Sequence, residues 1–244
     1  MTPEHGLSLF VEAAGHRFLF DTGASGGFAD NAARLGADLT AAEFAILSHG
    51  HYDHGGGLPQ FLEINAHAPI YVSRYCFDEC RNASGKYIGL DPALQNCGRL
   101  ILTGDEYPIA PGLTLLSCNH RPQRADPFGL TRREGDGLIP DDFRHEQYLL
   151  IEEDGKRILL SGCSHKGIVN LVNWFRPDVL VGGFHFKSLS PEDPRLMEYG
   201  KALAASGTVF YTGHCTGQAQ FDALRPLLGD NLHPISTGSV FEIP

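Results

Sequence analysis

The segment from Ser48 to Gly57 reads SHGHYDHGGG and places three imidazoles and one carboxylate within six residues. The apolar run Phe44 to Leu47 precedes it and predicts a buried strand, so the polar cluster is expected on a loop at the carboxyl end of that strand. Three glycines follow, which let the backbone approach a bound group closely. A His-rich surface tract would not need this setting, so the pattern H-x-H-x-D-H indicates metal binding.

The spacing of this motif predicts two metal sites. In a turning loop alternate residues point the same way, so His49 and His51 are expected to bind one ion while Asp53 and His54 turn towards a second. Imidazole with one carboxylate suits zinc, iron or manganese, whereas calcium and magnesium prefer oxygen ligands. We expect two divalent metal ions, with Zn²⁺ as the first choice and Fe or Mn as alternatives.

Four ligands cannot complete two coordination spheres, and the second half of the chain offers further histidines. Three segments share one form, an apolar strand followed by small residues and a histidine: they end at His165, His185 and His214. One such histidine alone would more often be structural, but three of them beside H-x-H-x-D-H favour metal ligands. The pattern leaves open whether His185 or His214 is the last ligand.

Strands followed by helices recur in both halves of the chain. Apolar patterning predicts a hairpin over 7–20, strands at 44–47, 70–72, 148–152, 157–160, 178–181, 208–211 and 239–243, and helices at 31–35, 167–175, 194–205 and 218–228. This order predicts two sheets packed face to face with helices outside, in a single domain spanning 1–244. The polar segment 119–144 shows no period and predicts a long loop at the active site.

Composition excludes several classes of function. The formal net charge is -10, and the absence of a basic stripe argues against nucleic-acid binding. No apolar run approaches the ~20 residues of a membrane span, and the first residues do not resemble a secretory leader, so a cytoplasmic location is expected. The six cysteines are scattered, which favours free thiols. A small-molecule substrate is the expected partner, and the sequence does not set the oligomeric state.

Two groups of motifs resemble a known family. FLFDTG at 18–23 together with SHGHYDHGGG resembles the metallo-β-lactamase superfamily, and this implies an α/β fold, an αββα sandwich of two mixed sheets with metals at one sheet edge. GCSHKGIVN at 162–170, VGGFHF at 181–186 and TGHCTG at 212–217 are similar to the dihydropterin ribofuranosylaminobenzene-phosphate synthase-like branch. The resemblance covers almost the whole chain.

The resemblance implies roles for individual residues. The first metal would be held by His49, His51 and His165, and the second by Asp53, His54 and His214. Asp21 resembles the carboxylate that orients ligands in this family. His185 would face the substrate or support the ligands, and His120 ranks below His165 as a ligand.

Cys163 departs from the family pattern. It stands where many members of the superfamily carry an aspartate that bridges the two ions. Three alternatives follow: Cys163 ligates as a thiolate, the ions share only a hydroxide, or the second site fills weakly.

The activity that the resemblance implies is metal-dependent hydrolysis. Water activated between the ions would attack a carbonyl carbon or phosphorus, with Asp53 as the catalytic residue that binds metal and orients the nucleophile. One alternative is the synthase reaction of the branch. Another is a di-iron oxidoreductase that uses a separate electron donor.

Arginines in the loop 119–144 suggest a substrate class in this acidic protein. Arg121 and its neighbours, together with Lys166 and His120, would bind the phosphate or carboxylate of a small ester, phosphoester or lactone. The alternative is that the arginines pair with nearby acids as a solvated mixture of charges. The residues concerned are Arg121, Arg124, Arg132 and Arg133 and the acids Glu134, Asp136, Asp141 and Asp142.

Overall fold

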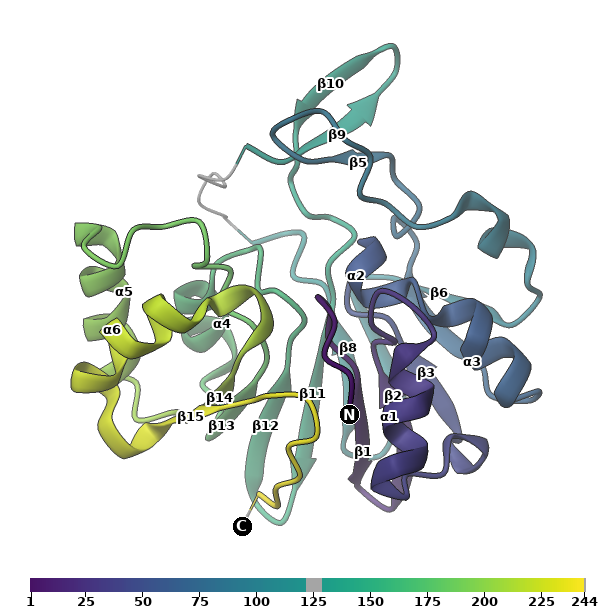
Figure 1. Ribbon diagram of the computed structural model, residues 1–244, viewed down its shortest axis with the longest axis horizontal. Helices are drawn as coiled ribbons and strands as arrows, with labels where there is room; N and C mark the ends of the chain where they lie inside the picture. The colour runs from purple at the N-terminus through teal and green to yellow at the C-terminus, as the bar shows by residue number, and fades with distance from the viewer. Residues whose placement is uncertain (122–128, 244) are drawn as a thin grey trace.

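The computed structural model describes residues 1–121 and 129–243. Two mixed β-sheets face each other in this part of the chain, and helices cover the outer face of each sheet (Figure 1). This arrangement is the predicted αββα sandwich. No helix among the described residues combines the length and the apolar character needed to cross a membrane.

The first sheet has the strand order β1-β2-β3-β4-β6. Its strands are Leu9–Ala13 (β1), His16–Phe20 (β2), Phe44–Ile46 (β3), Ile70–Ser73 (β4) and Leu100–Thr103 (β6). β1 and β2 form the predicted antiparallel hairpin, whereas the other neighbours run parallel. The outer helices are α1 (Gly27–Leu35) and α3 (Leu58–Ile64), and the short α2 (Tyr52–Gly55) lies within the His-rich segment.

The second sheet has the order β15-β14-β13-β12-β11-β8-β7. Its strands are Glu106–Ala110 (β7), Leu113–Leu116 (β8), Tyr148–Glu153 (β11), Lys156–Leu160 (β12), Val179–Val181 (β13), Val209–Thr212 (β14) and Leu232–Pro234 (β15). Strands β12 to β15 are parallel neighbours, and β11, β8 and β7 continue the sheet in antiparallel pairs. Its outer helices are α4 (Ile168–Phe175), α5 (Pro194–Ala204) and α6 (Gln218–Leu228).

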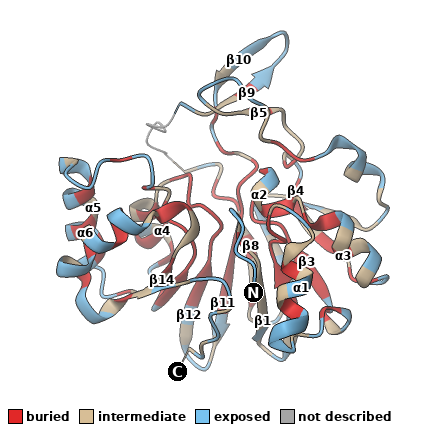
Figure 2. Ribbon diagram, in the orientation of Figure 1, coloured by how far each residue is buried: buried red, intermediate tan, exposed pale blue. Residues whose placement is uncertain are grey.

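The hydrophobic core forms three layers that follow from the alternation of side chains along each strand. Phe18 and Phe20 on β2 point into the layer between the two sheets, while Leu19 between them packs towards α1 and α3. A third layer lies between the second sheet and its helices. The central strands are accordingly buried on both faces (Figure 2), so the sheet edge that carries the polar cluster is set by a rigid scaffold.

Two predicted elements differ from the structure. The last strand was predicted at 239–243, but in the structure the last strand is β15, which lies earlier and pairs with β14. β15 has only three residues, one of them a proline, so its sequence shows no alternation that would predict a strand. The predicted loop 119–144 contains a hairpin, β9 (Thr131–Glu134) and β10 (Gly137–Pro140), which joins β5 (Cys80–Arg81) in a small third sheet. The charged side chains of β9 leave no alternation of apolar and polar residues that would predict a strand. Arg124 lies outside the described residues.

Candidate metal centre

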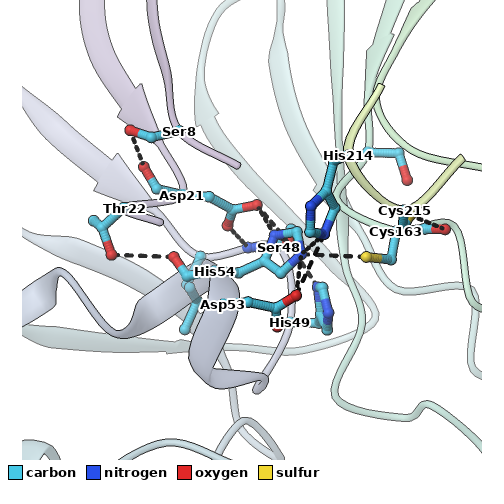
Figure 3. Close-up of polar contacts among 12 residues, drawn as sticks. Ser8, Asp21, Thr22, Ser48, His49, Asp53, His54, Cys163, His214 and Cys215 are labelled. Atoms are coloured by element: carbon cyan, nitrogen blue, oxygen red, sulfur yellow. Dashed lines mark hydrogen bonds and ion pairs between the residues drawn. The ribbon is translucent and has the colours of Figure 1, made fainter. Parts of the chain in front are cut away.

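Strand ends bring the predicted ligands together at one edge of the two sheets. β3 leads to Ser48 and His49, and β2 leads to Asp21, because these parallel strands end at the same edge. In the other sheet, the parallel strands β12, β13 and β14 lead to His165, His185 and His214, respectively. Figure 3 shows residues of both sheets converging on one site.

The first group of ligand atoms belongs to His49, His51 and His165, whose donor atoms all lie within 4.8 Å of one another. Nε2 of His49, Nε2 of His51 and both ring nitrogens of His165 are buried and have no hydrogen-bond partner. Burial lowers the pKa of all three rings, to about 3 for His51, so the imidazoles are neutral at pH 7. Buried polar atoms rarely stay without a partner, and a metal cation fits these lone pairs.

The second group consists of Asp53, His54 and His214. The Nε2 atoms of His54 and His214 are 3.2 Å apart, and Asp53 Oδ2 lies 3.4 Å from His214 Nε2 and 3.9 Å from His54 Nε2. Burial alone would raise the pKa of Asp53, but His54 and His214 outweigh it and hold that pKa far below its usual range. Asp53 is therefore a carboxylate that faces two imidazole nitrogens.

Asp21 orients ligands of both groups from the interior. Its Oδ2 accepts hydrogen bonds from Nδ1 of His54 at 2.7 Å and from the hydroxyl of Ser48 at 2.7 Å. Nδ1 of His49 in turn donates to Ser48 Oγ at 2.9 Å. These contacts place the protons of His49 and His54 on Nδ1 and leave Nε2 of each free to bind a metal.

The charges around His54 favour a cation. Burial opposes a positive charge on this ring, but Asp21 and Asp53 more than offset it and raise the pKa of His54 to about 9. Because Nδ1 already donates to Asp21, the additional positive charge falls at Nε2. A metal ion at Nε2 supplies that charge without protonating the ring.

Cys163 lies beside both groups. Its Sγ is 3.2 Å from His54 Nε2 and belongs to one group of donor atoms with His49 and His54, and to another with His214 and Cys215. Burial raises the pKa of the Cys163 thiol well above its usual value. The thiol is thus positioned next to the second group in its neutral form.

His185 lies at the rim of the site. Its ring centroid is 4.3 Å from that of His165, and its backbone N–H donates to Sγ of Cys215 at 3.3 Å. The donor-atom groups among the described residues include His214 and not His185. The geometry therefore favours His214 over His185 as the last ligand.

Three predicted substrate contacts lie away from the cluster. Lys166 is 1% exposed, and its Nζ donates to Ser117 O, Asn119 Oδ1 and Glu146 O; the prediction that it meets an anionic substrate does not agree with this burial. The His120 side chain is 65% exposed and faces Asp105. The guanidinium of Arg121 lies over the ring of Trp174.

The arginines of β9 form ion pairs within the protein. Arg132 donates to Asp142 at 3.0 and 2.9 Å and to Glu134 at 3.1 Å, and Arg133 donates to Glu79. Arg132 thus pairs with two of the acids expected in the pairing alternative, although its side chain is buried rather than solvated, and Arg133 pairs with an acid outside that set. Asp141 also departs from that alternative, because it is buried and contacts His145 Nε2 at 3.2 Å.

Two further histidines at the site were missed in the sequence. His5 lies 3.5 Å from Asp53 Oδ2. His145 accepts a hydrogen bond from Gly50 N at its Nδ1 and faces Cys80 and Asp141 through Nε2. Each histidine precedes an antiparallel strand, β1 or β11, and such a strand begins at the edge where its parallel neighbours end. The signal for both histidines lies in the strand order, which places the residues before these antiparallel strands at the edge of the site.

A cavity of about 170 Å³ opens at this site. Its wall combines His51, Asp53 and His165 with the apolar side chains of Ile88 and Leu130. The polar cluster is therefore reached through a small entrance with a partly apolar rim.

Comparisons with known proteins agree with this geometry. The family model of the metallo-beta-lactamase superfamily matches residues 1–183. The 7,8-dihydropterin-6-methyl-4-(beta-D-ribofuranosyl)-aminobenzene-5'-phosphate synthase of Methanocaldococcus jannaschii is 29% identical, and the match covers 88% of this chain and 81% of the relative. An uncharacterized protein of the same organism is 26% identical over 92% of this chain and 87% of its own length.

Among solved structures, the crystal structure of Tm1679, a metal-dependent hydrolase of the beta-lactamase superfamily, has a TM-score of 0.83 and 26% identity, and the match covers 98% of this chain and 92% of that one. The predicted resemblance to the superfamily and to the synthase-like branch is confirmed by these matches. The chain belongs to the metallo-β-lactamase superfamily.

Proposed function

We propose that the protein is a metal-dependent hydrolase with a dinuclear site. The observation that carries the proposal is the set of buried imidazole nitrogens of His49, His51 and His165, which lack any protein partner and converge within 4.8 Å. Neutral imidazoles that are buried without hydrogen bonds cost folding free energy, and a bound cation removes this cost. The likeness to Tm1679 supports hydrolysis as the class of reaction.

His49, His51 and His165 would hold the first ion, and Asp53, His54 and His214 the second. Nitrogen donors with a single carboxylate favour Zn²⁺, with Fe or Mn as alternatives. When bound, such ions lower the pKa of water and stabilise negative charge on a substrate oxygen.

The side chains around the ligands would keep the site ready for this chemistry. Asp21 and Ser48 fix the tautomers of His49 and His54, so these rings need no rearrangement to bind. Asp53 is ionised and faces the cavity, where its carboxylate can hold and orient a hydrogen-bonded substrate or water. The apolar side chains of Ile88 and Leu130 in the cavity wall would exclude part of the bulk water from the reacting groups.

The substrate that this site favours is a small ester, phosphoester or lactone. The cavity of about 170 Å³ is smaller than the roughly 300 Å³ lower bound for pockets that hold drug-sized ligands. Its wall, among the described residues, includes no lysine or arginine, and Arg132 and Arg133 are already paired. Any preference for an anion would therefore come from the ions rather than from the arginines.

Metal analysis together with a substrate panel tests the proposal. The protein would be purified without added metal, analysed for zinc, iron and manganese, and assayed with phosphomonoesters, phosphodiesters, lactones and thioesters. We expect about two equivalents of metal and turnover that His51→Ala abolishes and that His67→Ala, an exposed histidine outside the site, leaves intact. Full turnover in His51→Ala or in chelated protein would contradict the proposal.

A synthase activity is the second candidate, because a relative 29% identical carries that name. The product in that name joins a dihydropterin-6-methyl group to an aminobenzene that carries a ribofuranosyl 5'-phosphate, so the reaction would require a dihydropterin activated at its methyl carbon and ribofuranosylaminobenzene phosphate as the acceptor, with loss of the activating group. Incubation of the metal-loaded protein with both compounds, followed by detection of the joined product, distinguishes it from hydrolysis. The small cavity favours the hydrolase.

A further inference from the structure

The segment from Glu4 to Leu7 lies against the second group of ligands. The Nε2 atom of His5 is 3.5 Å from Asp53 Oδ2, and the His5 ring centroid is 4.6 Å from that of His214. The donor atoms of these three residues all lie within 4.8 Å of one another. His5 also lines the cavity, with its side chain 49% exposed at the entrance.

Contacts on both sides of His5 fix its position. The Glu4 carboxylate accepts hydrogen bonds from Ala24 N at 3.1 Å, Ser25 N at 3.3 Å and Ser25 Oγ at 2.6 Å. On the other side Leu7 N donates to Asp53 O, and Leu7 O accepts from Gly23 N. The backbone next to His5 is therefore hydrogen-bonded directly to the segment that carries Asp53.

Gly6 makes this close approach feasible. A Cβ atom at this position would lie 2.6 Å from the carbonyl oxygen of Asp53 and 3.0 Å from Ala24 N, which a larger residue could not accommodate without moving the backbone. The sequence Glu4-His5-Gly6 thus combines an anchor, an imidazole and a residue small enough to let the imidazole reach the site.

The distances match one coordination sphere. Metal–ligand bonds of about 2.0–2.1 Å in a tetrahedron place neighbouring donor atoms about 3.4 Å apart. The donor pairs within Asp53, His54 and His214 are 3.2, 3.4 and 3.9 Å apart, and His5 Nε2 lies 3.5 Å from Asp53 Oδ2. The His5–Asp53 distance thus fits neighbouring donors of one ion, and the donor atoms of His5, Asp53 and His214 all lie within 4.8 Å of one another.

We propose that His5 is a ligand of the second metal ion and completes its protein coordination together with Asp53, His54 and His214. This inference rests on the proposed metal-dependent function. Cys163 is the competing fourth donor, since its Sγ lies 3.2 Å from His54 Nε2 on the other side of the site. A thiolate and an imidazole give different cobalt spectra, so the two donors can be distinguished.

The experiment uses the full chain loaded with Co²⁺ and with Zn²⁺. Binding isotherms and cobalt absorption spectra would be recorded for the wild type, His5→Ala, Cys163→Ser and the matched control His67→Ala. We expect His5→Ala to bind the first ion normally and the second at least about tenfold more weakly, since even an outer partner of a ligand contributes 10- to 100-fold. Added imidazole should restore the wild-type cobalt spectrum of His5→Ala.

Several outcomes would overturn the proposal. A wild type that binds two ions, with a second-ion affinity and cobalt spectrum unchanged in His5→Ala, rejects His5 as a ligand and leaves the proposed function standing. A sulfur-to-cobalt charge-transfer band that Cys163→Ser removes, with no effect of His5→Ala, assigns the fourth position to the thiol. A wild type that binds no ion rejects the proposed function and this proposal together. Because His5 is half exposed, the unfolding midpoint of metal-free His5→Ala should match that of the metal-free wild type.

Discussion

At the scale of single residues, Asp21 determines how the site is arranged. It accepts from Ser48 N, Ser48 Oγ and His54 Nδ1, and it is fully buried. A carboxylate can accept all these bonds, whereas an amide would turn a donor towards at least one of them.

We therefore expect Asp21→Asn to weaken metal binding by about 10- to 100-fold, because the orientation and basicity of His49 and His54 both depend on this carboxylate. Competitive titration with a chromophoric chelator measures the affinity. The control is Asp38→Asn, whose side chain bonds Thr40 at the surface. Equal affinities in Asp21→Asn and the wild type would contradict the assignment.

The buried histidines predict how stability depends on pH in the metal-free protein. Burial lowers the pKa of His51 to about 3 and of His185 and His214 to about 4, whereas an exposed histidine has a pKa of about 6.5. Between pH 6.5 and 4 the unfolded chain therefore binds protons that the folded chain does not, and the free energy of unfolding falls as the pH falls. His54, whose pKa is raised to about 9, contributes stability below pH 6.5 that is lost as the pH rises through 9.

Through each of His51, His185 and His214, the free energy of unfolding should fall by up to about 1.4 kcal/mol for every pH unit below 6.5. Urea unfolding of the chelated protein at pH 7 and pH 5 measures the change, and His51→Gln should show a smaller one. A free energy of unfolding that is constant or higher at pH 5 would contradict the predicted burial of neutral rings.

The residues of the H-x-H-x-D-H motif could be found in the sequence because they are close together there. His165 and His214 could be found because each follows a readable apolar strand. His5 and His145 could not, since they reach the site from the beginnings of antiparallel strands, and their significance depends on a sheet order that no local pattern reports.

At the scale of elements, the site depends on how closely β3 and β12 end beside each other. Gly162 follows β12, and a Cβ there would lie 2.2 Å from Ser48 Oγ and 2.9 Å from His49 Nδ1. The two strand ends therefore meet without room for a methyl group.

We expect Gly162→Ala to lower the free energy of unfolding by about 1–3 kcal/mol, as overpacking does, and to weaken binding of the first ion by displacing His49. Urea unfolding and metal titration measure the two effects. Gly137→Ala on β10 is the matched control, because the added methyl group would meet nothing closer than Glu134 O at 3.8 Å. Normal metal affinity in Gly162→Ala would show that the junction is less rigid than its contacts indicate.

Strong alternation made most elements predictable. The hairpin β1–β2 and the alternation of strands and helices after residue 148 were predicted within a few residues of their bounds. β9 was missed because three of its four side chains are charged and obtain partners from other segments, as Arg133 does from Glu79. β10 was missed because it is four residues long and has a glycine and a proline at its ends. β15 was missed because it is too short to show a period.

At the scale of the whole molecule, the proposed ions connect the two sheets. His49 and His51 follow a strand of the first sheet, whereas His165 follows a strand of the second. Any ion bound by all three rings therefore links the two halves of the sandwich.

Removal of metal should lower the midpoint of thermal unfolding, because a ligand that binds only the folded state stabilises it by about 2.7 kcal/mol at 100 times its dissociation constant. Calorimetry of chelated and Zn²⁺-loaded protein measures the shift, and Mg²⁺ should not reproduce it because nitrogen donors suit this ion poorly. Equal midpoints with and without Zn²⁺ would argue against a link between the sheets.

The contact of Asp21 with both ligand groups has a consequence for the order of loading. Asp21 reaches His54 directly and His49 through the Ser48 hydroxyl, so an ion at either place polarises the same carboxylate. Occupancy of one position must then alter the affinity of the other, and by thermodynamic reciprocity the effect is equal in both directions. The two positions would therefore have coupled affinities rather than independent ones.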